Sequence, residues 1–119
     1  MDEQNVHQFY GISPAIDLLE LCNLDDSADS NEPVRILQVA SYDCRHTLYT
    51  MCRLNRHSAA LGNRPVHLYV YEEEAEVLAR HLVLWSVMLD AALPARERVE
   101  VLLELHGNAL LRERTADYL

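Results

Sequence analysis

The chain has 119 residues, of which half are hydrophobic, and this length suits one domain with a real core. All ten residues counted as lysine or arginine are arginines, which excludes chemistry that needs a lysine amine, such as Schiff-base catalysis. The net charge of −9 argues against binding to a phosphate backbone, so we expect no nucleic-acid partner.

The acid surplus lies at the N-terminal end. Residues 1–33 hold eight acidic residues and no arginine, whereas residues 34–119 carry eleven acids against ten arginines. We therefore predict two parts: an acidic N-terminal helix and loop over residues 1–33, forming a solvated or partner-facing appendage, and a nearly neutral α/β domain over residues 34–119. Ser13 and Pro14 mark the start of a helix predicted over residues 12–22.

Two segments rich in β-branched and aromatic residues predict strands over residues 34–40 and 66–71. The first is almost continuously apolar, as expected of a strand covered on both faces. A helix over residues 44–57, which Asp43 can cap, connects them, so the strands should be parallel. Because two strands are too few for a stable open sheet, either strands outside this sequence or a second copy of the chain should complete it.

Two further helices are predicted over residues 72–92 and 94–106, and the first opens on acids that complement the helix dipole. Its apolar side chains at helical spacing predict a core-facing stripe, formed by Leu78, Leu82, Trp85 and Leu89.

The predicted fold is α/β, a partial Rossmann or methyltransferase-like βαβ unit with parallel strands and flanking helices. In such folds a ligand lies at the carboxyl ends of the strands, over a glycine-rich loop. The loop after the first strand has no glycine, and a tyrosine ring takes the space that a ligand would need. We expect no bound cofactor, and the candidates for a vestigial pocket are Ser41, Tyr42, Asp43, Cys44 and Glu72.

The cysteines show no metal or disulfide pattern, because Cys22, Cys44 and Cys52 are widely spaced without a CxxC motif. Cys44 follows the first strand at a helix start, beside Arg45 and His46, a setting that can activate a thiol. A small, partly buried residue in the first helical turn is the favoured interpretation. No histidine or cysteine pair has ligand spacing, so we expect no metal site and no catalytic residue.

Residues 106–112 admit two interpretations. A Gly-Asn pair between two amphipathic segments is typical of a helix C-cap or hinge. The alternative is a surface that docks a partner, formed by Gly107, Asn108, Leu110, Leu111 and Arg112.

Four segments carry a resemblance to a known family, and they are GISPAIDL (11–18), DCRHTL (43–48), EAEVLARHLVLWS (74–86) and HGNALLR (106–112). In this order and spacing, residues 9–119 resemble the N-terminal domain of the dynein axonemal assembly factor 3 family. The resemblance implies a cytoplasmic factor for preassembly of axonemal dynein arms of cilia and flagella. It also implies the N-terminal portion of a longer protein, with a methyltransferase-like fold.

We consider two hypotheses for the function of this chain. The first is a non-enzymatic scaffold that binds axonemal dynein chains or co-chaperones. The second is a divergent S-adenosylmethionine-dependent methyltransferase domain, motivated by the strand–helix–strand order and by Glu72. We favour the first, and a homodimer of the isolated chain is a further expectation.

Overall fold

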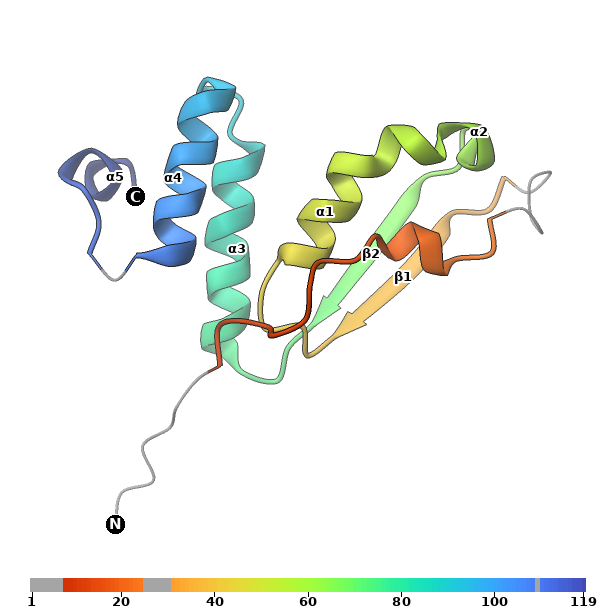
Figure 1. Ribbon diagram of the computed structural model, residues 1–119, viewed down its shortest axis with the longest axis horizontal. Coiled ribbons are helices and arrows are strands. Elements are labelled where there is room, and N and C mark those ends of the chain that lie inside the picture. The colour runs from red at the N-terminus through yellow and green to blue at the C-terminus, as the bar shows by residue number, and fades with distance from the viewer. Residues whose placement is uncertain (1–7, 25–30, 109) are drawn as a thin grey trace, which may run out of the picture. The chain divides into compact units, whose positions relative to one another are not determined.

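The computed structural model describes residues 8–24, 31–108 and 110–119 (Figure 1). The chain forms two compact units, one up to Leu78 and one from Ala79 onward, and each is described by itself. The predicted division at residue 33 stays a prediction, and parts of that N-terminal region, residues 1–7 and 25–30, lie outside the described residues.

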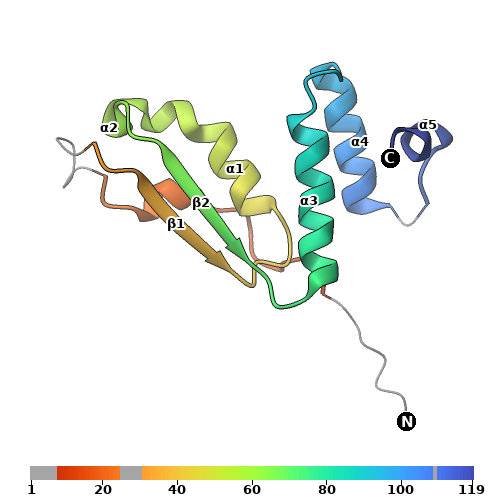
Figure 2. The same ribbon diagram turned by 180° about the vertical axis from the view of Figure 1, so that it is seen from behind.

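The first unit is built on two parallel strands, β1 (Val34–Val39) and β2 (Val66–Tyr71), as the sequence predicts. They pair in register along their whole length. A helical connection runs between them along one face of the sheet (Figures 1 and 2), so the class is mixed α/β.

The connection is not one helix. The helix predicted over residues 44–57 consists of α1 (Arg45–Arg53) and a 3-10 turn, η3 (Leu54–His57), and α2 (Ser58–Leu61) continues it. Gly62 ends this stretch with a φ of 57°, a conformation that glycine adopts without steric strain.

Side chains on the strands alternate between a covered and an open face. The inward positions, with Leu19, Leu24 and Leu61, form the core of the first unit, and they include Val34, Ile36 and Val66. The opposite face is exposed in both strands. Within the described residues of this unit, only the face that the connection packs against is covered, so the prediction of a strand covered on both faces is not met there.

The N-terminal segment also differs from its prediction. Instead of a helix over residues 12–22, it forms only a short 3-10 turn, η1 (Leu18–Leu21). The backbone N–H groups of Ile16 and Leu18 donate to side chains of α1 rather than to carbonyls of their own segment. Since Leu18 and Leu19 are buried, the interpretation of this region as a solvated appendage is wrong for them.

The remaining helices are α3 (Ala75–Leu89), which begins in the first unit, α4 (Ala95–Gly107) and α5 (Glu113–Tyr118). Within the second unit, the Arg80 guanidinium donates to the His106 carbonyl at 2.8 Å and joins α3 to α4. The Tyr118 hydroxyl donates to Asp90 at 2.7 Å and holds the end of α5. Among the described residues, every helix is too short or too polar to cross a membrane.

The stripe on α3 that we predicted to face the core is mostly exposed. Leu82 and Leu89 are 64% and 67% exposed, whereas the buried side chains of α3 are Val77, His81, Leu84 and Val87. The prediction was wrong because α3 is apolar nearly all round, and periodicity then cannot choose which side is buried.

Candidate functional site

The loop after β1 is the first candidate site, and its backbone is unusual. Ala40 and Tyr42 have φ values of 50° and 64°, in the left-handed region that normally favours glycine. Each such residue costs roughly 1–2 kcal/mol, and it persists only where the surroundings hold it. The loop thus has left-handed turns without any glycine.

Glu72, at the end of β2, holds this loop in place. Its Oε1 accepts hydrogen bonds from the Ser41 N–H at 3.0 Å, the Ser41 hydroxyl at 3.0 Å and the Tyr42 N–H at 3.1 Å. Neighbouring N–H groups of this kind are a typical anion-binding site. The structure therefore brings Ser41, Tyr42 and Glu72 together, and the carboxylate occupies the donors that an anionic ligand would use.

Asp43 ties the same loop to the N-terminal segment. Its buried carboxylate accepts the Gly11 N–H at 2.6 Å, the Arg45 N–H at 3.0 Å and the Arg45 guanidinium at 2.7 Å. Burial disfavours the charged form, but the bonds from Gly11 and Arg45 outweigh it and lower the pKa of Asp43. Asp43 was predicted to cap this helix; its side chain does accept the first N–H of α1, that of Arg45, but the N-cap residue is Cys44.

Gly11 is needed where it lies. The Arg45 guanidinium crosses directly over it and also donates to the Ser13 carbonyl at 2.8 Å. A Cβ added at Gly11 would lie 1.8 Å from Arg45 Nη1, so alanine would displace the guanidinium.

A row of polar side chains on α1 and η3 binds the N-terminal segment, and sequence reasoning missed it. Thr50 Oγ1 accepts the Leu18 N–H at 2.9 Å, and His46 Nδ1 accepts the Ile16 N–H at 3.1 Å. Burial and the charge of Arg45 lower the pKa of His46, which favours the neutral ring that can accept. The signal was the spacing of His46, Thr50, Arg53 and His57 on one helical face.

Asp17 lies at the end of this row. Its side chain is fully buried and receives the Arg53 guanidinium at 3.1 Å and His57 Nε2 at 2.8 Å. Burial opposes ionisation, but the bonds from His57, the Leu19 N–H and Arg53 outweigh it and lower the pKa of Asp17. Arg53 also binds Glu20 at 2.8 Å.

Two cysteines of this unit, Cys22 and Cys44, are at least partly buried. Cys22 lines the same surface pocket as His57, but burial and the charge of Asp17 raise its thiol pKa. A raised pKa reduces the reactive thiolate. Cys44 is only 2% exposed, and it lies at the N-cap of α1 rather than in its first turn.

A pocket of about 340 Å³ lies beside the loop after β1, where a cofactor would bind in a Rossmann-like fold. Gln38 lines it, and its Oε1 accepts from the Thr47 hydroxyl at 2.8 Å. Gln38 Nε2 is buried without a hydrogen-bond partner in the described structure. No cluster of side chains suited to a metal ion occurs among the described residues.

The second candidate site lies where α4 passes into α5, in the second unit. Glu104 is buried, and its carboxylate accepts the Arg112 N–H at 2.5 Å, Arg112 Nε at 2.9 Å and the Thr115 hydroxyl at 2.7 Å. These bonds lower the pKa of Glu104, the Arg112 N–H most. They attach α5 to α4.

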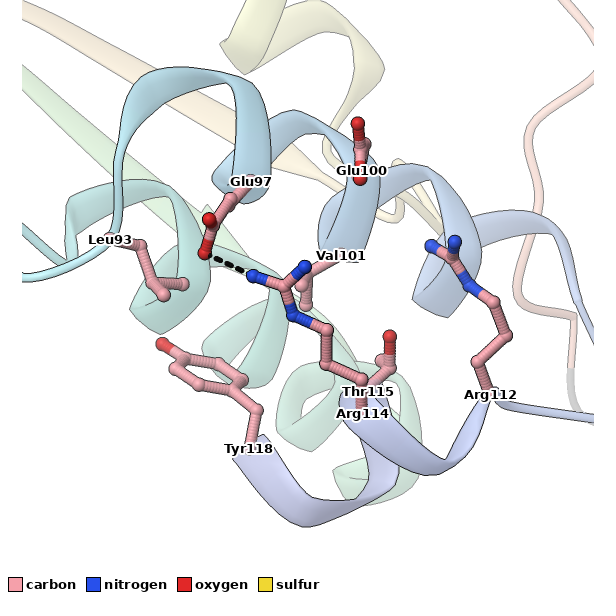
Figure 3. A pocket seen from close by; sticks show the side chains of 8 residues that line it. All are labelled: Leu93, Glu97, Glu100, Val101, Arg112, Arg114, Thr115 and Tyr118. Atoms are coloured by element: carbon pink, nitrogen blue, oxygen red, sulfur yellow. Dashed lines mark ion pairs between the residues drawn. The ribbon is translucent and has the colours of Figure 1, made fainter.

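Figure 3 shows the pocket of about 150 Å³ between α4 and α5. The Arg114 guanidinium reaches across it to Glu97 at 2.6 Å, and the Tyr118 ring lies beside Leu93. This ion pair joins α5 to α4 across the pocket.

The residues predicted to bind a partner lie around the end of α4. Leu110 is 89% exposed, and Gly107 and Asn108 are exposed as well, whereas Leu111 is half-buried. The Arg112 side chain is 67% exposed although its Nε binds Glu104. Ala109, between them, lies outside the described residues.

Three of these residues share one hollow of the surface. An open pocket of about 470 Å³ is lined by Asn108, Leu110 and Arg112 together with Leu103, which is 63% exposed. We call this the Leu110 groove. Sequence reasoning missed Leu103 because its spacing on α4 is equally typical of a core residue.

A family model described as a domain of unknown function (DUF4470) matches residues 9–111. The chain belongs to this family. Dynein axonemal assembly factor 3 homolog of Chlamydomonas reinhardtii is 52% identical, over 100% of this chain and 18% of that protein. Dynein axonemal assembly factor 3 of Xenopus laevis is 35% identical, over 93% of this chain and 24% of that protein. The human protein of that name is 32% identical, over 92% of this chain and 21% of that protein.

These comparisons confirm the resemblance that the sequence strings indicated. The DUF4470 chain spans about a fifth of the length of these curated relatives. No solved structure matches it. Two of the strings, 11–18 and 43–48, contact each other in this structure, because the Gly11 N–H donates to Asp43 and the Arg45 guanidinium donates to the Ser13 carbonyl.

Proposed function

We propose that this domain is a non-enzymatic protein-interaction module in the cytoplasmic preassembly of axonemal dynein arms. The names of its relatives support a role in this process, since these proteins are called dynein axonemal assembly factors. In this proposal its partners are axonemal dynein chains or co-chaperones, and it binds neither nucleic acid nor membrane.

One observation carries the interaction role, the exposure of Leu110. A leucine that is 89% exposed, next to an exposed Leu103 over an open groove, has no role in the packing of the domain. Apolar side chains grouped in this way are typical of protein-binding sites, where a few central residues carry most of the affinity.

The polar rim of the Leu110 groove suggests the kind of segment that it binds. Arg112 at one side donates its Nε to Glu104, while its side chain stays 67% exposed. Glu100 lines the groove as well. We propose that it takes an apolar side chain from a partner segment that carries charges of both signs.

Leu110→Asp should reduce co-precipitation of dynein chains or chaperones from an extract of ciliated cells by about tenfold or more, because a charge would enter the groove. The matched control is Leu82→Asp, the same change at another exposed leucine, 64% exposed on α3. Equal capture by both variants and the unchanged domain would contradict this role of the groove.

The alternative is a divergent methyltransferase on a partial Rossmann or methyltransferase-like unit. The pocket beside Gln38 supports it, since the Gln38 Nε2 donor is unused. Against it, Glu72 already accepts from Ser41 and Tyr42, so a methyl donor would have to displace an internal carboxylate.

Titration calorimetry with S-adenosylmethionine should therefore give no binding heat with the unchanged domain. Glu72→Gln serves as the comparison for the unchanged domain, because it removes the negative charge that accepts the hydrogen bonds of the loop. Saturable micromolar binding by the unchanged domain would favour the methyltransferase.

A further inference from the structure

The open face of the two-stranded sheet is a second surface, separate from the Leu110 groove. It consists of the outward side chains of both strands, Arg35, Leu37, Val39, His67, Tyr69 and Tyr71. Leu37 and Tyr71 are 66% and 59% exposed, and Val39 and Tyr69 are also at least half exposed. Four of the six side chains are thus large apolar groups in contact with solvent.

Parallel sheets almost never leave such a face open. Their crossover connections place helices on both sides, and their strands are apolar on both faces for this reason. Here the strands carry the two-sided apolar pattern, but the connection through α1 covers only one side. The sequence of the strands is therefore that of a sheet with a second layer.

The comparisons indicate where the second layer comes from. The curated relatives are about four to six times as long as the part that matches these residues, which is 18% to 24% of their length. We infer that an amphipathic helix from the part of the longer family protein outside these 119 residues packs on the open face. A helix is the expected occupant because strands add to the edges of a sheet, whereas helices cover its faces.

The face also indicates the polarity of this helix. Arg35 and His67 are direct neighbours across the strands, so one end of the face carries two basic residues, and none of its six side chains is acidic. The Arg35 guanidinium pairs with Glu32 at 3.5 Å, but both side chains are exposed, so this weak pair leaves Arg35 open to a further acid. The other two pairs, Leu37 with Tyr69 and Val39 with Tyr71, are apolar. The covering helix should therefore be apolar along its length, about 13 residues for a strand of about 20 Å, with acids over Arg35 and His67.

The test is thiol labelling of Leu37→Cys in two proteins, the isolated chain and a chimera in which it replaces the matching part of the Chlamydomonas relative. We expect at least tenfold slower labelling of position 37 in the chimera, resolved by peptide mass spectrometry. The native Cys52, exposed on α1, provides the internal reference for labelling. Tyr69→Cys gives the same readout should Leu37→Cys fail to fold.

Equal labelling rates in chimera and isolated chain would overturn the inference. Protection in the isolated chain that rises with its concentration, with a dimer mass in light scattering, would assign the face to a second copy instead. Protection in the isolated monomer would also overturn it, because the chain would then cover its own face. This test is independent of the Leu110 groove, so its failure leaves the proposed function unaffected.

The charge of the helix is tested by adding Arg35→Glu to the chimera that carries Leu37→Cys. Labelling should accelerate severalfold, because the reversed charge repels the acids. Arg56→Glu, an exposed arginine on η3, is the matched control. If the two charge reversals changed the labelling rate equally, the inference that the covering helix places acids over Arg35 would be overturned.

Discussion

Asp17→Ala should lower the free energy of unfolding by about 3 kcal/mol, because it removes the buried acceptor of two side-chain hydrogen bonds, one of them from an arginine. Arg53 and His57 both donate to this carboxylate, and the Leu19 N–H donates to it as well. The N-terminal segment should then separate from α1. Urea denaturation monitored by circular dichroism measures the loss.

Glu20→Ala is the matched control for this change. Glu20 binds the same Arg53 guanidinium at 2.8 Å, but its side chain is 56% exposed. An exposed ion pair contributes about 0.2–1 kcal/mol, so this variant should stay close to the unchanged protein. Similar losses of unfolding free energy in both variants would show that the burial of Asp17 does not determine its contribution to stability.

The contribution of Asp17 should also depend on pH. Its pKa is below the ordinary value in the folded protein, despite burial, through its bonds to His57, Leu19 and Arg53. The stabilisation is therefore fully present above about pH 4 and is lost as the pH falls through the lowered value. Denaturation curves of the unchanged protein and Asp17→Ala should converge as the pH falls below about 4.

Glu104→Ala should release α5 from α4 without unfolding the rest of the second unit. The change removes the acceptor of the Arg112 N–H, Arg112 Nε and the Thr115 hydroxyl at one time. We expect the amides of Thr115 and Ala116 to exchange with solvent at least about tenfold faster. Hydrogen exchange followed by mass spectrometry measures this.

Glu100→Ala is the control, one turn earlier on α4. Glu100 pairs with Arg96 at 3.0 Å on the surface, so its loss should leave α5 protected. Capture of partners should fall with Glu104→Ala as well, because Glu104 holds Arg112 at the Leu110 groove. Unchanged exchange in α5 would contradict the role of Glu104 as its attachment.

Much of the fold could be predicted from local pattern. The two strands and the ends of α4 agree with their predictions, because β-branched runs favour strands, Pro94 starts a helix and Gly107 ends one. At the candidate site, the meeting of Ser41 and Tyr42 with Glu72 follows from parallel strands, whose carboxyl ends lie at the same edge of the sheet.

The internal role of Glu72 could not be predicted in the same way. A carboxylate at this position serves a ligand or the protein itself, and only the hydrogen bonds to the loop distinguish the two. The left-handed conformations of Ala40 and Tyr42 could not be predicted from the sequence either, since neither residue type favours them.

By itself, the sequence determined the parallel strands, the family and the uneven distribution of charge, all of which depend on residue order and composition. Only the tertiary structure decided that residues 16–18 are not helical and that Asp17 is buried. The reason is that their partners, His46, Thr50, Arg53 and His57, lie about thirty to forty residues further along the chain. Local periodicity cannot report hydrogen bonds that form only after α1 has packed beside the N-terminal segment.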